Sequence, residues 1–210
     1  MRRGWVAVVP VKRLGAAKSR LRGAVPDARH ADLALAMLGD TAAAVLACPS
    51  VDELIIVTDD PAAVAVADAV GARAVPDEPD AGLNAAFRHG ADVVAGRDRR
   101  RIAMAGDLPA LRPDELSEAI RHIEGRSFVT DAAGTGTVLL GVPEGVDLDP
   151  RFGPGSAAAH GESALDITAD WPGLRQDVDT EKDLRAVARI GVGPRTRALL
   201  RDVGRIEKAA

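Results

Sequence analysis

Short apolar runs alternate along the chain with longer segments that have the periodicity of helices. Most of the runs are bounded by glycine, proline or acidic residues, and they lack the polar alternation of a half-exposed strand. This pattern favours strands that are covered on both faces, as in parallel sheets. Strands are predicted at residues 5–11, 53–57, 73–75, 102–105, 127–130 and 137–142. The glycine-rich segment 131–136 joins the last two, which predicts a hairpin or paired strands rather than another crossover.

Helices are predicted between these strands, and proline or glycine marks many of their ends. They are expected at residues 26–47, 61–70, 82–95, 113–125 and 180–190. Thr180 and Asp183 have the spacing of a capping box at the start of the last helix. The alternation of strand and helix predicts right-handed crossovers and an α/β fold with a largely parallel sheet. We expect one domain over residues 1–193, followed by a peripheral helix or frayed tail over 194–210.

Two acidic residues are candidates for site chemistry. Asp107 follows the strand predicted at 102–105 and lies within Gly-Asp-Leu-Pro. It is therefore expected at the carboxyl edge of the sheet, where open α/β sheets bind ligands, and a divalent metal or a ligand hydroxyl would suit it. Shaping the turn before Pro109 is the alternative use. Asp179 is expected at the amino end of the helix that begins at Thr180, where it could also serve only the helix dipole.

Two loops are candidates for binding anions. Segment 12–23, KRLGAAKSRLRG, follows the first strand and places Lys12 and Lys18 around the flexible Gly15. Its cations and backbone N–H groups could bind phosphates, although it has neither the Walker spacing nor the dinucleotide fingerprint, and a solvated basic loop is the alternative. Segment 151–160, RFGPGSAAAH, could seat an anionic substrate or could be an ordinary connector.

Composition and charge narrow the classes of function. The 27 basic and 31 acidic residues are mixed along the chain and give a formal net charge of −4, which argues against a nucleic-acid partner. No apolar run is long enough to cross a membrane. The single cysteine, Cys48, is expected to be a small buried residue and fits a reduced, cytoplasmic compartment. The four histidines, His160 among them, are expected to be surface or packed residues rather than catalysts.

The order of several short motifs resembles that of one enzyme family. The motifs are PVK (10–12), AKSRL (17–21), VTD (57–59), GLNAA (82–86), GDLP (106–109), FGPGS (152–156) and DVDT (177–180). Together they are similar to the 2-phospho-L-lactate / phosphoenolpyruvate guanylyltransferase family, which acts in making the deazaflavin coenzyme F-420. GDLP alone would also suit molybdenum-cofactor and sugar nucleotidyltransferases, whereas FGPGS with GLNAA and DVDT is more specific. The similarity covers about residues 5–193.

The resemblance implies a single-domain, Rossmann-like nucleotidyltransferase fold with helices on both faces of the sheet. It also implies GTP as a substrate, Mg²⁺ as the cofactor, and a small phosphorylated carboxylic acid as the acceptor. By this carry-over, the metal ligands are Asp107 and Asp179, which with Lys18 form the catalytic set. The implied nucleotide-binding residues are Lys12, Gly15, Lys18, Asp59, Gly82 and Asn84. The implied acid-binding residues are Thr137, Gly153 and Ser156.

Guanylyl transfer is compatible with this set of residues. The attacking phosphate is already ionised near neutral pH, so that no general base is needed, and catalysis depends on alignment and on neutralising charge. The product would be a reactive guanosine-diphospho acid, which suggests a downstream transferase as a partner. The residues do not choose between phosphoenolpyruvate and 2-phospho-L-lactate, although the bacterial-looking composition favours phosphoenolpyruvate.

Other functions remain open from the sequence. Asp177-Val178-Asp179 has the D-x-D form of metal-dependent glycosyltransferases, although it comes late in the chain for such an enzyme. A different nucleotidyltransferase, acting on a molybdenum cofactor or a sugar phosphate, is a second alternative. A nucleotide-binding regulatory domain without turnover is a third, and its ligand affinity would largely survive the loss of both Asp107 and Asp179.

Overall fold

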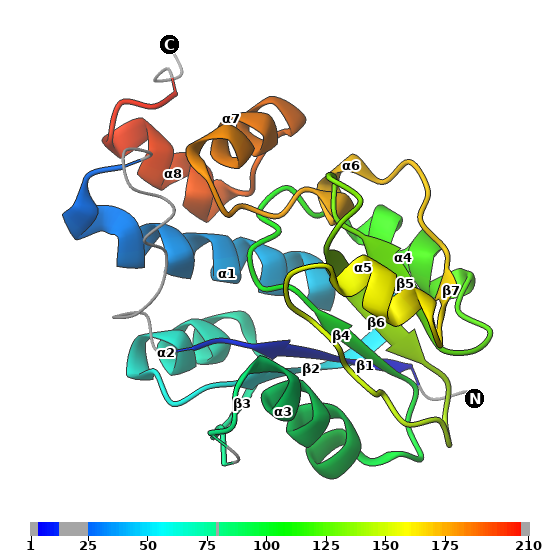
Figure 1. Ribbon diagram of the computed structural model, residues 1–210. Coiled ribbons are helices and arrows are strands. Elements are labelled where there is room, and N and C mark those ends of the chain that lie inside the picture. The colour runs from blue at the N-terminus through cyan, green and yellow to red at the C-terminus, as the bar shows by residue number, and fades with distance from the viewer. Residues whose placement is uncertain (1–3, 13–24, 79, 207–210) are drawn as a thin grey trace.

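A seven-stranded mixed sheet forms the centre of the computed structural model, which describes residues 4–12, 25–78 and 80–206 (Figure 1). The strand order is β3-β2-β1-β4-β6-β5-β7. The strands are β1 (Trp5–Pro10), β2 (Val51–Val57), β3 (Arg73–Val75), β4 (Arg101–Met104), β5 (Ser127–Thr130), β6 (Thr137–Val142) and β7 (Leu165–Asp166). Strands β1 to β4 pair in parallel, whereas β6 is antiparallel to both β4 and β5. The expected α/β fold is confirmed.

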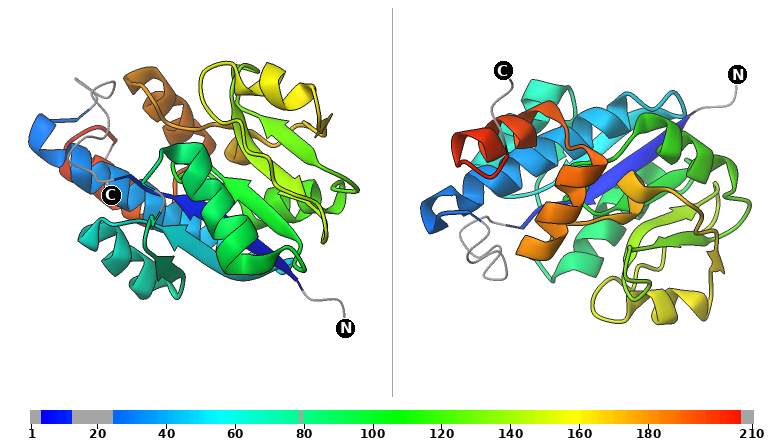
Figure 2. Two further views of the ribbon diagram at one scale, coloured as in Figure 1. Left: turned by 60° about the horizontal axis from the view of Figure 1, so that its bottom comes forward. Right: turned by 90° about the horizontal axis from the view of Figure 1, so that it is seen from above.

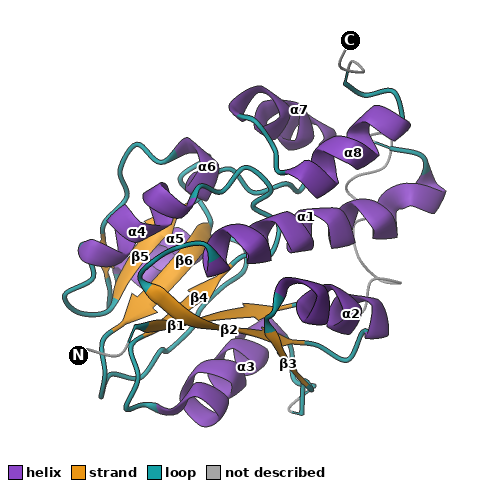
Figure 3. Ribbon diagram, turned by 180° about the vertical axis from the view of Figure 1, so that it is seen from behind, coloured by secondary structure: helices purple, strands orange, loops and turns teal. Residues whose placement is uncertain are grey.

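Helices cover both faces of this sheet (Figure 3). They are η3 (Asp27–Arg29), α1 (His30–Leu46), α2 (Pro61–Val70), α3 (Leu83–Arg88), η4 (His89–Gly96), α4 (Pro113–Arg121), α5 (Ser156–Gly161), α6 (Pro172–Arg175), α7 (Glu181–Ile190) and α8 (Pro194–Asp202). Strand β1 contributes side chains to the hydrophobic core on each face of the sheet, because successive side chains of a strand point to opposite faces. Ala7 and Val9 pack in the core that contains residues of α1, α2 and α4, whereas Val6 and Val8 pack with residues of α3 and η4.

Most predicted elements are present, and the differences are local. Both hydrogen bonds of the predicted capping box form: the Thr180 N–H donates to Asp183 Oδ2 over 2.8 Å, and the Asp183 N–H donates to Thr180 Oγ1 over 3.3 Å. The single helix expected over 82–95 is instead α3 followed by the π-helical η4. A Cβ on Gly90 would lie 2.5 Å from Cγ1 of Val8, so η4 approaches the sheet more closely than any other residue type would allow. The short β7 and α6 were not predicted.

The turn after β4 is tied to segments that are distant in the sequence. Leu108 donates its backbone N–H to Thr41 Oγ1 of α1 over 3.0 Å. Val178 donates its N–H to the carbonyl oxygen of Asp107 over 3.2 Å. The second bond brings the DVDT segment against the GDLP turn, although the two are far apart along the chain. It therefore places the backbone of Asp107 next to the segment that carries Asp179.

Helix α8 packs along α1, and Figure 2 shows the two side by side in both views. The nearly buried carboxylate of Asp40, in α1, accepts the N–H groups of Arg195 and Thr196 over 3.1 and 2.8 Å, and so caps the first turn of α8. Gly193 donates its N–H to the carbonyl oxygen of Pro109 over 2.8 Å. Residues 194–202 thus form a docked helix, and the residue before it is bonded to the GDLP turn. The domain boundary at residue 193 stays a prediction.

Replacing Asp40 by Ala is expected to lower the free energy of unfolding by about 1–3 kcal/mol, because a buried and a part-buried N–H donor of α8 lose their acceptor. Urea unfolding at neutral pH measures the change. Asp32→Ala is the matched control, because Asp32 lies in the same helix and pairs with Arg29 at the surface; it is expected to cost less than about 0.5 kcal/mol. Equal losses in the two variants would contradict the capping role of Asp40.

Candidate active site

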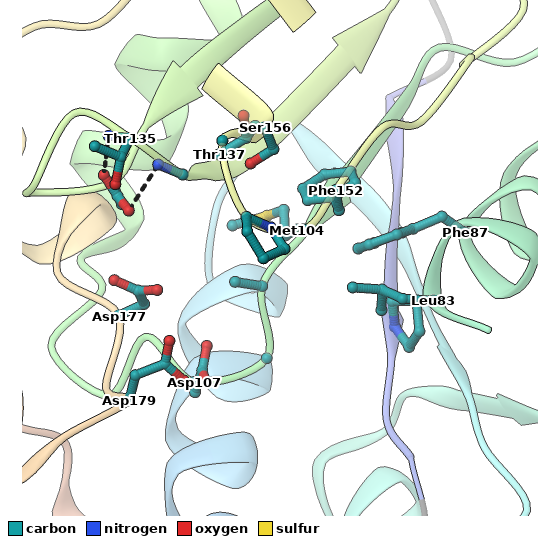
Figure 4. Close-up of a pocket in the computed structure, with 18 residues that line it drawn as sticks. Leu83, Phe87, Met104, Asp107, Thr135, Thr137, Phe152, Ser156, Asp177 and Asp179 are labelled. Atoms are coloured by element: carbon teal, nitrogen blue, oxygen red, sulfur yellow. Dashed lines mark hydrogen bonds between the residues drawn. The ribbon is translucent and has the colours of Figure 1, made fainter. Parts of the chain in front are cut away.

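A cavity of about 540 Å³ lies where β1 and β4 end and β6 begins (Figure 4). Its wall comes from segments that are far apart in the sequence: the end of β1, the turn after β4, α3, the loop before β6, the FGPGS loop and the DVDT segment. Of the predicted site residues, it is lined by Asp107, Thr137, Gly153, Ser156 and Asp179. The fold therefore brings the two predicted metal ligands and the three predicted acid-binding residues into one cavity.

Three carboxylates gather at one end of the cavity. Figure 4 shows the side chains of Asp107, Asp177 and Asp179 close to one another, on two segments that the backbone bond between Val178 and Asp107 joins. Burial, followed by the negative charges of Asp107 and Asp179, raises the pKa of Asp177 from its ordinary value of 3.8 to about 7. This end of the cavity is therefore strongly electronegative, and its oxygen atoms are of the kind that hard divalent cations prefer.

These carboxylates do not form a complete metal cage. Among the residues that the structure describes, no group of three or more His, Cys, Asp or Glu side chains is arranged to hold a metal ion. A magnesium ion commonly uses one or two protein carboxylates and takes its other ligands from water and substrate phosphates. The pair Asp107 and Asp179 fits that kind of open site by its chemistry.

The loop before β6 is held by Asp131, which the sequence did not single out. Its carboxylate accepts the N–H groups of Thr135 and Gly136, both over 2.9 Å. These bonds shape the turn that delivers Thr137 to the cavity wall at the start of β6. Asp131, Thr135 and Asp177 all line the cavity. Asp177 had been named only as part of the D-x-D pattern, and nearness in sequence to Thr137 was the signal that could have found Asp131 and Thr135.

The side chain of Asn84 holds the FGPGS loop. Its Nδ2 donates to the carbonyl oxygen of Phe152 over 3.0 Å, and its Oδ1 accepts the N–H of Phe152 over 2.7 Å. The ring of Phe152 also stacks on that of Phe87, with ring centroids 4.2 Å apart. Gly153 and Gly155 have φ of +137° and +73°, which favours glycine at both positions. Asn84 thus contacts protein backbone through both ends of its amide, and its predicted contact with the nucleotide stays a prediction.

His160 is buried behind the cavity wall, in agreement with the expectation of a packed residue. Its Nδ1 lies 2.8 Å from Thr137 Oγ1, and its Nε2 accepts the backbone N–H of Arg151 over 2.9 Å. Burial, aided by the positive charge of Arg151, lowers the pKa of the imidazole to about 4. The ring is consequently neutral at physiological pH, and it connects β6 to the start of the FGPGS loop.

The remaining predicted residues lie around the same sheet edge or outside the described residues. Lys12 is exposed just after β1, and Asp59 is exposed just after β2, where its carboxylate accepts the N–H of Asp77 over 3.3 Å. Gly82 has φ of +94° and precedes α3. Gly15 and Lys18 lie outside the described residues, so their predicted contact with phosphates stays a prediction. No helix in the described part of the chain has both the length and the apolar character to span a membrane.

Comparison with known proteins gives consistent matches over nearly the whole chain. Residues 5–208 match the family described as "Guanylyl transferase CofC like". The chain is 56% identical over 200 residues to the phosphoenolpyruvate guanylyltransferase of Salinispora arenicola (strain CNS-205), covering 93% of this chain and 92% of the relative. It is 52% identical over 207 residues to the phosphoenolpyruvate guanylyltransferase of Geodermatophilus obscurus, covering 94% of each.

A solved structure shows a similar fold. The nucleotidyl transferase from Methanothermobacter thermautotroptrophicus has a TM-score of 0.64 and 23% sequence identity, covering 89% of this chain and 97% of that chain. At this identity the likeness concerns the fold, and it agrees with the arrangement of sheet and helices described above.

The buried His160 is expected to make folding stability depend on pH. Its pKa is lower in the folded protein than the ordinary 6.5, so the unfolded chain binds a proton that the folded protein excludes between about pH 6.5 and 4. The free energy of unfolding is therefore not reduced by this effect above about pH 6.5, and it decreases as the pH falls from about 6.5 to 4. From pH 7 to pH 5, we expect His160 to account for a loss of about 2 kcal/mol.

Urea unfolding of the wild type and of His160→Asn at pH 7 and pH 5 measures this loss. The asparagine does not titrate, so the variant is expected to lose less stability on acidification than the wild type does. His122→Asn, at an exposed histidine of the α4 end, is the control and is expected to follow the wild type. A His160→Asn variant with the pH dependence of the wild type would contradict the proposed neutral imidazole.

Proposed function

The chain belongs to the CofC-like guanylyl transferase family, and we propose that it transfers GMP from GTP to phosphoenolpyruvate with release of pyrophosphate. The family expected from the motif order is thereby confirmed. The observation that carries the proposal is the single cavity that collects Asp107 and Asp179 with Thr137, Gly153 and Ser156. The relatives that are 56% and 52% identical to this chain carry the name of this activity, which supports phosphoenolpyruvate over 2-phospho-L-lactate.

The reaction makes limited chemical demands on the protein. A phosphate oxygen of the acid attacks the α-phosphorus of GTP, and the bond from that phosphorus to the bridging oxygen of pyrophosphate breaks. The nucleophile is an ionised phosphate, so no side chain has to remove a proton from it. The protein contributes by aligning two anions and by neutralising the charge that they bring together.

Asp107 and Asp179 are proposed to hold a magnesium ion together with phosphate oxygens and water. Their support is geometric and electrostatic: the backbone bond from Val178 to Asp107 joins the two segments, and the neighbouring carboxylates raise the pKa of Asp177. When bound, the ion would supply positive charge to the phosphates of GTP. The two aspartates would fix the position of the ion. Asp107 lies in the turn after β4, and the bond from Val178 to Asp107 holds the segment that carries Asp179 against this turn.

The acid is proposed to bind at the other end of the cavity. Figure 4 shows Thr137 and Ser156 next to each other, apart from the three aspartates. Thr137, Gly153 and Ser156 belong to two separate segments, which Asn84 and His160 tether from behind. This arrangement would place the acid's phosphate between fixed donors on one side and the nucleotide on the other.

The nucleotide is proposed to approach along the carboxyl edge of β1 and β2. Lys12 and Asp59 follow these two strands, and Gly82 and Asn84 lie just before and in the first turn of α3. Segment 12–23 supplies the further cations expected to bind phosphates. The product, a reactive guanosine-diphospho acid, is proposed to pass to a transferase of coenzyme F-420 biosynthesis. We propose the cytoplasm as the place of the reaction.

Pyrophosphate release tests the proposed activity directly. The protein is incubated with GTP and Mg²⁺, and with phosphoenolpyruvate or 2-phospho-L-lactate in separate reactions. We expect turnover with phosphoenolpyruvate, and at most slower turnover with the lactate derivative. Turnover with a sugar phosphate or molybdopterin but with neither acid would contradict the proposal, and GTP binding without any turnover would favour a regulatory domain.

Neutralising either proposed metal ligand is expected to abolish most activity. Asp107→Asn and Asp179→Asn each remove a negative charge without changing the size of the side chain, and we expect kcat to fall about a hundredfold or more. Circular dichroism checks that the variants remain folded. Asp68→Asn, at an exposed position of α2, is the control and is expected to keep the wild-type rate. Near-normal turnover of either active-site variant would exclude a site that needs both carboxylates.

A further inference from the structure

His160 is a titratable side chain that is almost completely buried next to the cavity. Its side chain, on α5, is 1% exposed. The ring lies between Phe128 and Phe152, with centroid distances of 5.9 and 5.1 Å, and the contact with Phe152 is edge-on. Arg151 reaches it at Nε2 and Thr137 at Nδ1, and the backbone of Ser156 is a further polar neighbour, which favours a protonated ring nitrogen. His160 does not itself line the cavity, whereas Thr137 does.

The contact with Arg151 determines which ring nitrogen carries the proton. A backbone N–H is always a donor, so His160 Nε2 must accept through its lone pair. A neutral imidazole with an unprotonated Nε2 carries its proton on Nδ1. The enclosure by Phe128 and Phe152 and the nearby charge of Arg151 disfavour a second proton on the ring, which agrees with its lowered pKa.

This tautomer determines the direction of the Thr137 hydroxyl. The protonated Nδ1 donates to Thr137 Oγ1 over 2.8 Å, so that the hydroxyl accepts from the ring and its single hydrogen is directed elsewhere. Thr137 lies in the cavity wall beside Ser156 (Figure 4). An acceptor in the cavity, such as a phosphate or carboxylate oxygen, would receive that hydrogen.

We propose that His160 is a positioning residue that fixes the Thr137 hydroxyl as a hydrogen-bond donor to an anionic oxygen of the acid. The same ring holds the backbone of Arg151, the residue that precedes Phe152 and Gly153, so it aligns the two segments of the acid-binding end together. The identity of the anion as the acceptor acid rests on the proposed function, whereas the tautomer and its effect on Thr137 do not.

The tautomer is measured first and without any substrate. In protein labelled with ¹⁵N-histidine, His160→Asn identifies the signals of His160 among those of the four histidines. We expect Nδ1 to be protonated and Nε2 to be unprotonated at pH 7. A protonated Nε2, in either a neutral or a charged ring, would overturn the proposal whatever reaction the protein catalyses.

A double-mutant cycle tests the action through Thr137. Thr137→Val and His160→Phe are each expected to raise the KM for phosphoenolpyruvate about tenfold or more, the effect of losing one hydrogen bond to a charged group. The KM for GTP is expected to change less than about twofold, because the acid alone receives this bond. The rise in KM for the double variant is expected to be clearly smaller than the product of the two single effects, because the part of the His160 effect that acts through the hydroxyl is already lost in Thr137→Val.

Conservative variants and a control separate positioning from a merely structural role. Thr137→Ser keeps the hydroxyl and is expected to stay near the wild type, while His160→Asn keeps an N–H donor and is expected to recover part of the loss in His160→Phe. His122→Phe, at an exposed histidine, is expected to change neither KM. Additive effects in the double variant, or an equal rise in both KM values, would overturn the proposal.

Calorimetric binding of phosphoenolpyruvate keeps the test independent of turnover. If the wild type releases no pyrophosphate, the proposed function fails, yet weaker phosphoenolpyruvate binding in Thr137→Val and His160→Phe would still support the positioning role. Undiminished binding in Thr137→Val would overturn it. Should His160→Phe not fold, His160→Asn replaces it in the cycle, with the same non-additivity expected.

Discussion

Three hydrogen bonds to the backbone of the turn after β4 determine where the carboxylates of the candidate site lie. Leu108 bonds to Thr41 of α1, Asp107 receives the N–H of Val178, and Pro109 receives the N–H of Gly193. Each bond brings in a segment from a different part of the chain. Since the turn is held by α1, by DVDT and by the residue before α8, the carboxylates of Asp107 and Asp179 are positioned by most of the fold rather than by a local loop.

Distant parts of the chain also hold the cavity wall that contains Thr137 and the FGPGS loop, and here side chains make the hydrogen bonds. The Asn84 amide donates to and accepts from the backbone of Phe152, and His160 accepts the backbone N–H of Arg151, just before the FGPGS loop. Polar side chains that are bonded to the backbone in this way favour one conformation of the loop. The cavity thus has an electronegative end and a second end lined by Thr137 and Ser156. This arrangement would suit the proposed reaction between two anions, whose main cost is alignment.

Much of the fold could be predicted because its signals are local. Pro61 and Gly71 mark the two ends of α2, and the capping-box spacing of Thr180 and Asp183 predicts the start of α7. The insertion of the antiparallel β6 between β4 and β5 could not be predicted, since strand order depends on pairing between distant segments. The packing of α8 on α1 could not be predicted from the sequence either, because the residue that caps α8, Asp40, lies more than a hundred residues earlier in the chain.

For the candidate site, the sequence by itself determined which residue types follow which strands, and through motif order it determined the family. Asp107, Asp179, Thr137, Gly153 and Ser156 were identifiable in this way, and the structure collects them in one cavity. Only the tertiary structure decided that the carboxylate of Asp107 lies near Asp177 and raises its pKa, and that the amide of Asn84 bonds to the backbone of Phe152. It also decided that His160 links Thr137 to Arg151. The physical reason is that burial, charge proximity and hydrogen-bond direction depend on which distant segments meet, and a local pattern carries no record of that.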